Sequence, residues 1–227
     1  MSSFKSLGVT PKVIQGLKGL GIVKPTEIQV QSIPKLIKSE IDFIGMAQTG
    51  TGKTAAYSIP IIQNIDPSEP KIQALILCPT RELGQQIAKQ IFKFTKYTEK
   101  IFVEAVYGGE KIEAQISALR RKTHILVATP GRLLDLQRRK AVYLRKIKTV
   151  VLDEADEMLS VGFKKDLDLI LEQTSRASNT WLFSATMPKE ITQIINNYMD
   201  PEAVKVEANK GEKFNPDIVI NFGSCGN

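Results

Sequence analysis

The chain has 227 residues, which is enough for one or two domains with a large apolar core. Its 42% hydrophobic and 24% charged content is that of a soluble globular protein, and the absence of both a membrane-length apolar run and a signal-peptide core predicts a cytoplasmic location. The net charge of +7 favours a polyanion such as nucleic acid as a partner, although a basic surface is often merely solvated.

Six short apolar segments predict buried parallel strands, because they are apolar throughout rather than alternating. They lie at residues 41–47, 74–80, 102–109, 124–130, 149–155 and 179–186. Helical patterns lie between them at 81–97, 110–121 and 164–174; in the first, one face carries Leu83, Ile87, Ile91 and Phe94. This alternation predicts an α/β fold with a doubly wound, mostly parallel sheet flanked by helices, and ligands bound at the carboxyl ends of the strands.

The segment AQTGTGKT, residues 47–54, follows the first predicted strand and begins a helical pattern. It matches the phosphate-loop pattern G-x-x-x-x-G-K-[ST], except that Ala47 replaces the first glycine. Glycines allow backbone N–H groups to approach phosphate oxygens at a helix start, while Lys53 would add positive charge and Thr54 a hydroxyl ligand for Mg²⁺. The alternative is a glycine-rich turn that contains a lysine by chance.

Asp153 and Glu154 lie at the end of the fifth predicted strand, after four apolar or β-branched residues. A nucleoside triphosphatase needs a carboxylate beside the phosphate loop to hold Mg²⁺, and a base that orients the attacking water. Adjacent residues at a strand end point to different sides, so Asp153 could face the metal and Glu154 the water. An acidic, solvated turn is the alternative, and the phosphate loop makes it the weaker one.

The two cysteines and the single histidine argue against a zinc site or a histidine-based catalytic triad. Cys78 and Cys225 lie far apart without metal-ligand spacing, and His124 precedes an apolar strand. We expect Cys78 to be a buried apolar side chain, Cys225 a tail thiol and His124 a structural residue. From about Ala208 the chain becomes polar, so residues 208–217 predict a linker and 218–222 a further short strand.

Taken together, the motifs resemble the DEAD-box RNA helicase family. That family's phosphate loop reads A-x-T-G-x-G-K-T, so Ala47 follows the family pattern, and residues 153–156 spell DEAD. Further matches follow in the family's order, namely PTEIQ at 25–29, PTREL at 79–83, GG at 108–109, TPGR at 129–132 and SAT at 184–186. The resemblance covers about residues 4–210 and implies a RecA-like P-loop domain over 1–207, with an adenine-sensing Q motif region at 1–34 and the truncated start of a second domain after the linker.

The resemblance implies ATP and Mg²⁺ as cofactors. It assigns Glu154 as the catalytic base, Lys53 to the phosphates, and Thr54 and Asp153 to the metal. Gln29 would contact the adenine edge, although Ile22 stands where the family usually has phenylalanine. The residues expected to bind nucleotide are Phe4, Ile22, Thr26, Gln29, Gln48, Thr49, Gly50, Thr51, Gly52, Lys53 and Thr54.

The resemblance also implies RNA contacts to the backbone and sugars, which carry little sequence information. The alternatives are a carboxylate partner for Arg81 and helix capping for the TPGR and SAT motifs. The basic segment 138–148 could widen the RNA-facing field, but a solvated face is the favoured interpretation. The residues expected to bind RNA are Pro79, Thr80, Arg81, Gly108, Gly109, Thr129, Pro130, Gly131 and Arg132, and those expected to couple the metal site to domain closure are Asp156, Ser184, Ala185 and Thr186.

The family acts with two RecA-like domains, and the second carries an arginine finger in an H-R-x-G-R-x-x-R string that this sequence lacks. The implied function is therefore that of the first domain of an ATP-dependent RNA helicase, monomeric as a domain and nearly inactive alone. Two alternatives remain. One is an ATP-gated RNA clamp or scaffold without productive unwinding, and the other is a DNA-acting translocase, against which the adenine motif and the DEAD sequence argue.

Overall fold

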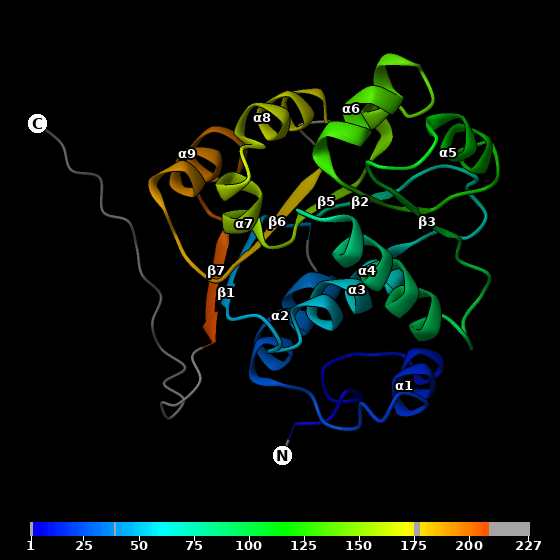
Figure 1. Ribbon diagram of the computed structural model, residues 1–227. Helices are drawn as coiled ribbons and strands as arrows, with labels where there is room; N and C mark the ends of the chain where they lie inside the picture. The colour runs from blue at the N-terminus through cyan, green and yellow to red at the C-terminus, as the bar shows by residue number, and fades with distance from the viewer. Residues whose placement is uncertain (1, 39, 175–177, 209–227) are drawn as a thin grey trace, which may run out of the picture.

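The computed structural model describes residues 2–38, 40–174 and 178–208, and its central feature is a seven-stranded sheet (Figure 1). All of its strand pairs are parallel, and the order across the sheet is β3-β4-β2-β5-β6-β1-β7. The predicted doubly wound α/β fold is therefore confirmed. The strands are β1 (Phe43–Ala47), β2 (Ala74–Leu77), β3 (Val103–Val106), β4 (Ile125–Ala128), β5 (Thr149–Leu152), β6 (Asn179–Ser184) and β7 (Val204–Ala208).

Helices cover both faces of the sheet (Figure 1). One face packs against α1 (Pro11–Lys18), α2 (Glu27–Lys38), α3 (Lys53–Asn64) and α4 (Arg81–Phe94). The other packs against α5 (Ile112–Leu119), α6 (Pro130–Arg138), the 3₁₀ helix η1 (Leu144–Lys146), α7 (Ala155–Ser160), α8 (Lys164–Gln173) and α9 (Lys189–Tyr198). No helix in the described ranges is long and apolar enough to cross a lipid bilayer.

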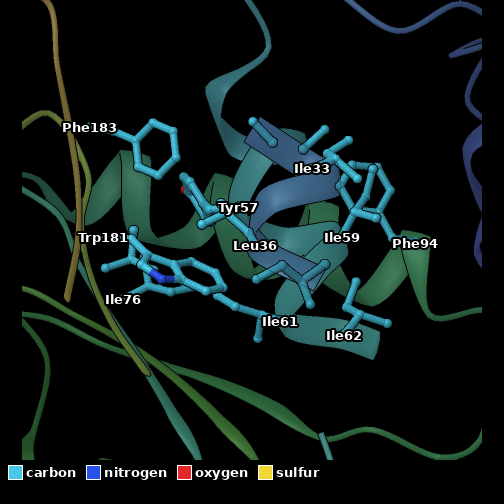
Figure 2. Close-up of a cluster of buried hydrophobic side chains, with 14 of the residues drawn as sticks. Ile33, Leu36, Tyr57, Ile59, Ile61, Ile62, Ile76, Phe94, Trp181 and Phe183 are labelled. Carbon is cyan, nitrogen blue, oxygen red and sulfur yellow. The ribbon is translucent and has the colours of Figure 1, made fainter. Parts of the chain in front are cut away.

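The central strands are apolar on both sides because both sides are covered. In β2, Leu75 and Leu77 enter the core beneath α5–α9, whereas Ile76 enters the core beneath α1–α4, as the alternation of side chains along a strand requires. The predicted apolar face of α4 is also confirmed, since Ile87 and Ile91 are fully buried in the core beneath α1–α4. Figure 2 shows the part of this core where α3 meets Trp181 and Phe183 of β6.

Strand β7 was not among the predicted strands. It forms the sheet edge beside β1, with Val204 opposite Phe43 and Ala208 opposite Ala47. Its sequence VKVEA alternates apolar and charged residues, as expected of an edge strand with one solvated side. Ala208 thus belongs to the sheet rather than to the linker, while the predicted linker and strand beyond it lie outside the described residues.

Cys78 and His124 have the structural roles expected from the sequence. Cys78 is fully buried, and burial raises the pKa of its thiol. His124 is buried and its Nδ1 accepts a hydrogen bond of 3.0 Å from the backbone N–H of Phe102. Cys225 lies outside the described residues.

Candidate functional site

The loop between β1 and α3 has the backbone conformation of a glycine-dependent turn. Gly50 and Gly52 have φ of +80° and +95°, which favour glycine over residues with a side chain. Nothing lies within 4 Å of a Cβ built on Gly50, so this part of the loop is open. The helix α3 starts at Lys53, and its first N–H groups therefore face the loop, as anion binding at a helix N-terminus requires.

Lys53 is the most informative residue of this loop. Its side chain is 6% exposed, and its Nζ has no hydrogen-bond partner in the part of the chain that the structure describes. A buried ammonium without a hydrogen-bond partner is costly, because it has lost its hydrogen bonds to water and made none to protein in exchange. An anionic ligand in the loop would supply the missing acceptors.

Asp153 lies at the carboxyl end of β5, adjacent to this loop. Its carboxylate is 2% exposed, with Oδ2 accepting a 2.7 Å hydrogen bond from the Tyr57 hydroxyl and Oδ1 a 3.1 Å hydrogen bond from the Glu154 N–H. Burial raises the pKa of Asp153 to about 6, although the Tyr57 hydrogen bond and the charge of Lys53 act in the opposite direction. The fold therefore brings together charges that are 100 residues apart in the sequence.

Glu154 occupies the turn between β5 and α7. Its φ of +52° lies in the left-handed region, which is uncommon for a residue with a side chain and recurs at functional sites. Its Oε1 accepts a 3.4 Å hydrogen bond from the Thr49 hydroxyl of the phosphate loop. Glu154 thus contacts the phosphate loop, and Asp153 contacts helix α3, which follows that loop.

Tyr57 is a residue of the site that the sequence analysis missed. It is fully buried, and its ring lies beside that of Phe183 (Figure 2), with the centroids 5.3 Å apart and the planes tilted by 57°. Its hydroxyl also interacts with the side chain of Thr54, so it joins the two residues expected to bind the metal. The available signal was its position three residues after Thr54, which places both side chains on one face of a helix.

The donor set fits a metal-bound nucleotide better than a metal held by protein alone. Among the described residues, no group of three or more His, Cys, Asp or Glu side chains is arranged to hold an ion. Mg²⁺ commonly binds through one or two protein oxygens together with phosphate oxygens and water, and Asp153 with Thr54 would supply such a partial set. The unpartnered amine of Lys53 would then face the phosphates.

Gln29 connects helix α2 to the phosphate loop. Its side chain is 3% exposed; Oε1 accepts a 3.0 Å hydrogen bond from the Thr26 N–H, and Nε2 donates a 3.0 Å hydrogen bond to the Gly52 carbonyl. A Cβ on Gly52 would lie 2.4 Å from Nε2, so any side chain here would displace the Gln29 amide from its place against the loop. The contact of Gln29 with adenine stays a prediction.

The two apolar residues expected at the adenine site lie in or against the core. Phe4 is 3% exposed and belongs to the core beneath α1–α4, so its ring is covered by protein in this conformation. Ile22 is partly buried against the same core. Within the phosphate loop, by contrast, Gln48 and Thr49 are exposed and Thr51 is half-buried, with its hydroxyl donating a 2.6 Å hydrogen bond to the Gln48 carbonyl.

The two arginines expected to bind RNA meet at one loop. Arg81 forms a 2.9 Å ion pair with Glu110 and lies over the ring of Tyr107, so it does have the carboxylate partner considered as its alternative role. Arg132 donates to the Gln115 side chain at 2.8 Å and to the Glu110 carbonyl at 3.0 Å. The motifs after β2, β3 and β4 therefore meet around the loop that carries Glu110.

The remaining residues of these motifs differ in exposure. Thr80 caps α4 by accepting a 3.2 Å hydrogen bond from Leu83 N–H, whereas Thr129 precedes α6 without a side-chain capping bond. Three of the predicted RNA-binding residues are buried and can shape the backbone only, namely Pro79, Thr129 and Pro130. The exposed or half-exposed ones are Thr80, Arg81, Gly108, Gly109, Gly131 and Arg132.

The SAT motif after β6 is joined to the DEAD motif. Thr186 donates from its N–H at 2.9 Å and from its hydroxyl at 2.8 Å to the same oxygen of Asp156, while the Ser184 hydroxyl donates to the Thr186 carbonyl at 2.7 Å. Burial opposes ionisation of Asp156, but the hydrogen bonds from Thr186 and Ser184 outweigh it and lower its pKa. Helix α9 has no side-chain cap, so the alternative capping role is wrong; Ala185 lies exposed between the two hydroxyl residues.

Known proteins are similar to this chain in sequence. A family model for DEAD/DEAH box helicases matches residues 26–194. The chain is 41% identical over 209 residues to the DEAD-box ATP-dependent RNA helicase CshA of Bacillus cereus, covering 92% of this chain and 39% of that protein. It is 43% identical over 222 residues to the ATP-dependent RNA helicase DeaD of Escherichia coli, covering 97% and 35%.

A solved structure shows the same fold. The chain superposes on a DEAD box protein from Methanococcus jannaschii with a TM-score of 0.87 and 38% identity, over 91% of this chain and 56% of that one. This agreement confirms the predicted RecA-like P-loop fold. The chain spans less than two-fifths of the length of the two curated relatives.

Proposed function

This chain belongs to the DEAD/DEAH box helicase family, and we propose that it is the first RecA-like domain of an ATP-dependent RNA helicase, binding ATP with Mg²⁺ at one part of its strand edge and the RNA backbone at another. The observation that carries this proposal is the buried amine of Lys53, which has no partner among the described residues, in an open glycine loop beside Asp153 and Glu154. A phosphate bound in the loop would supply the acceptors that this amine lacks.

Each residue of the site has a proposed role that follows from its position. Lys53 and the N–H groups at the start of α3 bind the phosphates, and Thr54 with Asp153 binds Mg²⁺. When bound, Mg²⁺ neutralises phosphate charge during phosphoryl transfer. Glu154, half-buried at the mouth of the loop, accepts a proton from the attacking water.

Two hydrogen-bonded connections would transmit occupancy of the site to its surroundings. The Gln29–Gly52 bond links the predicted adenine site to the phosphate loop. The Asp156–Thr186 pair of bonds links the turn that carries Glu154 to the segment after β6. In the whole protein, a second RecA-like domain would complete the site and use these connections to close around RNA.

On the RNA side, Arg81 and Arg132 would exchange partners when RNA binds. Arg81 would leave Glu110 for a phosphate oxygen, since an exposed ion pair contributes little on its own. Exposed backbone at Gly108 and Gly109 would allow close approach of the sugar-phosphate chain. Such contacts hold RNA without reading its sequence.

Steady-state ATP hydrolysis tests the proposal. The whole protein should hydrolyse ATP faster when RNA is added and should release strands from a short RNA duplex. The 227-residue chain alone should hydrolyse ATP hardly at all, because an arginine supplied from a second domain is typically worth about 10³–10⁵ in rate. Rapid RNA-stimulated hydrolysis by this chain alone would refute the assignment as one half of a two-domain site, and equal stimulation by DNA would refute RNA as its ligand.

A further inference from the structure

The basic segment 138–148 lies at the amino ends of the strands, whereas the site described above lies at their carboxyl ends. It connects the end of α6 to the start of β5, whereas Asp153 and Glu154 follow the carboxyl end of β5. A cleft of about 1,090 Å³ opens there, and its walls include Ile72 and Thr123, which precede β2 and β4. The cleft is therefore formed at the amino ends of the strands, and the segment cannot extend the RNA-facing edge directly.

The segment is anchored so that its polar side chains face outward. Val142, Leu144 and Ile147 are each 2% exposed and pack in the core beneath α5–α9. Between these anchors, Tyr143 is 68% exposed, and the charged side chains of Arg145 and Lys146 are also exposed. The anchors fix the exposed residues at the cleft, which reduces the entropy lost when they bind a partner.

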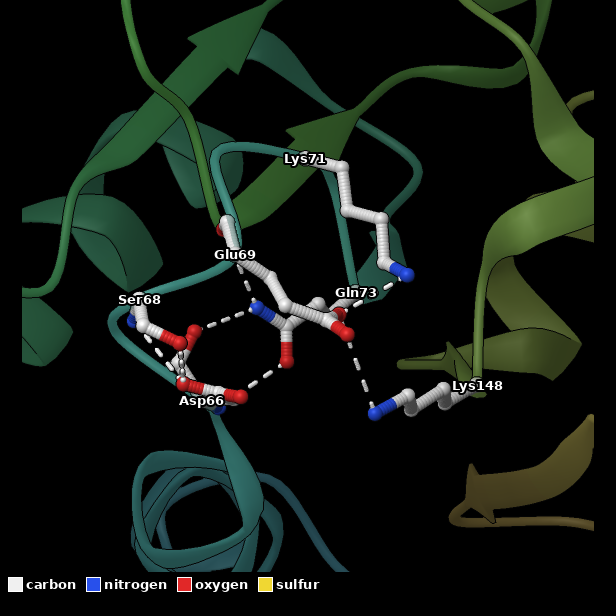
Figure 3. A network of polar contacts seen from close by, with 6 residues as sticks. All are labelled: Asp66, Ser68, Glu69, Lys71, Gln73 and Lys148. Carbon is white, nitrogen blue, oxygen red and sulfur yellow. Dashed lines mark hydrogen bonds and ion pairs between the residues drawn. The ribbon is translucent and has the colours of Figure 1, made fainter.

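The charge of this cleft is poorly balanced. Its walls carry four basic residues, namely Lys71, Arg121, Arg145 and Lys146, and one acidic residue, Glu172. Glu69 compensates part of the nearby charge, because Lys71 and Lys148 lie 2.8 Å and 4.0 Å from it (Figure 3). Arg121 interacts electrostatically with Glu104, whereas none of the described carboxylates forms an ion pair with Arg145 or Lys146.

An exposed aromatic ring beside uncompensated cations has the chemistry of a single-strand nucleic-acid site. The cations attract phosphates, and the ring offers a flat surface on which a base of any identity can stack. Helix α6 leads to this cleft from Arg132, and its nine residues span about 14 Å. A single RNA strand held at the strand carboxyl ends would reach this cleft after a short further path along α6.

We propose that Arg121, Tyr143, Arg145 and Lys146 form a second binding surface for single-stranded RNA, which holds the part of the strand that extends beyond the helicase site. We call these four residues the amino-edge platform. The proposal rests on RNA being the ligand of the proposed function. Single-stranded RNA fits this surface better than an acidic protein does, because an acidic segment would use the cations but not the exposed ring of Tyr143.

RNA length separates this platform from the helicase site. Fluorescence anisotropy would compare a uridine oligomer of about 8 nucleotides with one of about 25, using the 227-residue chain. The test variant is R145E/K146E, and the matched control is K12E/K18E, which changes the net charge equally on exposed positions of α1 against the opposite face of the sheet. Melting curves would verify that both variants fold.

The expected result is selective. For the long RNA, R145E/K146E should weaken binding about tenfold or more and reduce the salt slope by roughly 1–2, as the loss of about two phosphate contacts requires. For the short RNA it should match the control. Tyr143→Ala should weaken binding of the long RNA by roughly 5- to 100-fold through lost stacking, and Tyr143→Phe, which keeps the ring, should restore it.

Three outcomes would overturn one proposal or the other. If R145E/K146E binds the long RNA as well as the control does, while Arg132→Ala weakens binding of the short RNA, the platform is wrong and the proposed function stands. If R145E/K146E loses binding of polyglutamate but not of RNA, the platform's occupant is an acidic protein and the RNA assignment is wrong. If the unmodified chain and the whole protein bind neither RNA, the proposed function fails as well.

Discussion

The hydrogen bond between Tyr57 and Asp153 gives the sharpest test of how the site is built. Tyr57→Phe removes only the hydroxyl, leaves the ring in its contact with Phe183 and opens no large cavity. Because both residues are buried, the lost bond is not replaced by water. A hydrogen bond to a charged group is worth about 1.5–3 kcal/mol, against about 0.5–1.5 kcal/mol for a neutral pair.

The protonation of Asp153 makes this cost depend on pH. Burial raises its pKa to about 6 from 3.8, so the folded state holds a proton that the unfolded state has released between these two values. The stability that protonated Asp153 contributes is therefore fully present below pH 3.8 and is lost as pH rises through about 6. At about 1.4 kcal/mol per pKa unit, ionising the buried carboxyl lowers the free energy of unfolding by about 3 kcal/mol. Since the Tyr57 bond stabilises the ionised form, its removal should cost about 2–3 kcal/mol at pH 8 and about 1 kcal/mol at pH 5.

Urea unfolding at the two pH values would measure this difference. Tyr97→Phe is the matched control, because that ring is 38% exposed, and it should change the free energy of unfolding by less than about 0.5 kcal/mol. An equal cost of Tyr57→Phe at pH 5 and pH 8, or no cost at either, would refute the view that its hydroxyl stabilises an ionised Asp153.

Three further changes test separate parts of the site. Glu154→Gln in the whole protein should preserve ATP binding and reduce turnover by at least about 100-fold in a steady-state assay, and surviving turnover would exclude Glu154 as the base. Gly52→Ala should lower the free energy of unfolding by about 1–2 kcal/mol more than Gly50→Ala, since both have positive φ but only Gly52 is crowded by Gln29; equal losses would show that the crowding is relieved easily. Asp156→Ala should lower the free energy of unfolding of this chain by about 1 kcal/mol, because it removes both hydrogen bonds from Thr186. It should also reduce RNA-stimulated turnover of the whole protein while leaving ADP affinity unchanged. A matching loss of ADP affinity would show that this residue supports the nucleotide site itself.

Much of the site could be predicted because its parts are continuous in sequence. A phosphate loop needs a strand, two glycines and a lysine at a helix start within one short segment, and residues 43–54 supply them in order. The placement of Asp153 beside that loop followed from a different rule, namely that parallel strands end at the same edge. Both inferences use local pattern and topology only.

What could not be predicted depends on which side chains meet across the fold. The bond from Tyr57 to Asp153 requires the orientation of α3 against β5, and the bond from Gln29 to Gly52 requires the packing of α2 against the loop. Neither partner is encoded by periodicity. Strand β7 was missed for a different reason, because an edge strand alternates polar and apolar residues and lacks the continuous apolar run of the central strands.

The central claim is that Lys53 and Asp153 bind the same magnesium nucleotide, and the affinity of this chain for ADP, titrated by calorimetry with Mg²⁺ and with a chelator, tests it most directly. We predict that Mg²⁺ tightens binding to the unmodified chain, that Asp153→Asn abolishes this gain, and that Lys53→Ala weakens binding by at least about tenfold in either condition. Unchanged ADP affinity in Lys53→Ala, or a full Mg²⁺ effect in Asp153→Asn, would contradict the account.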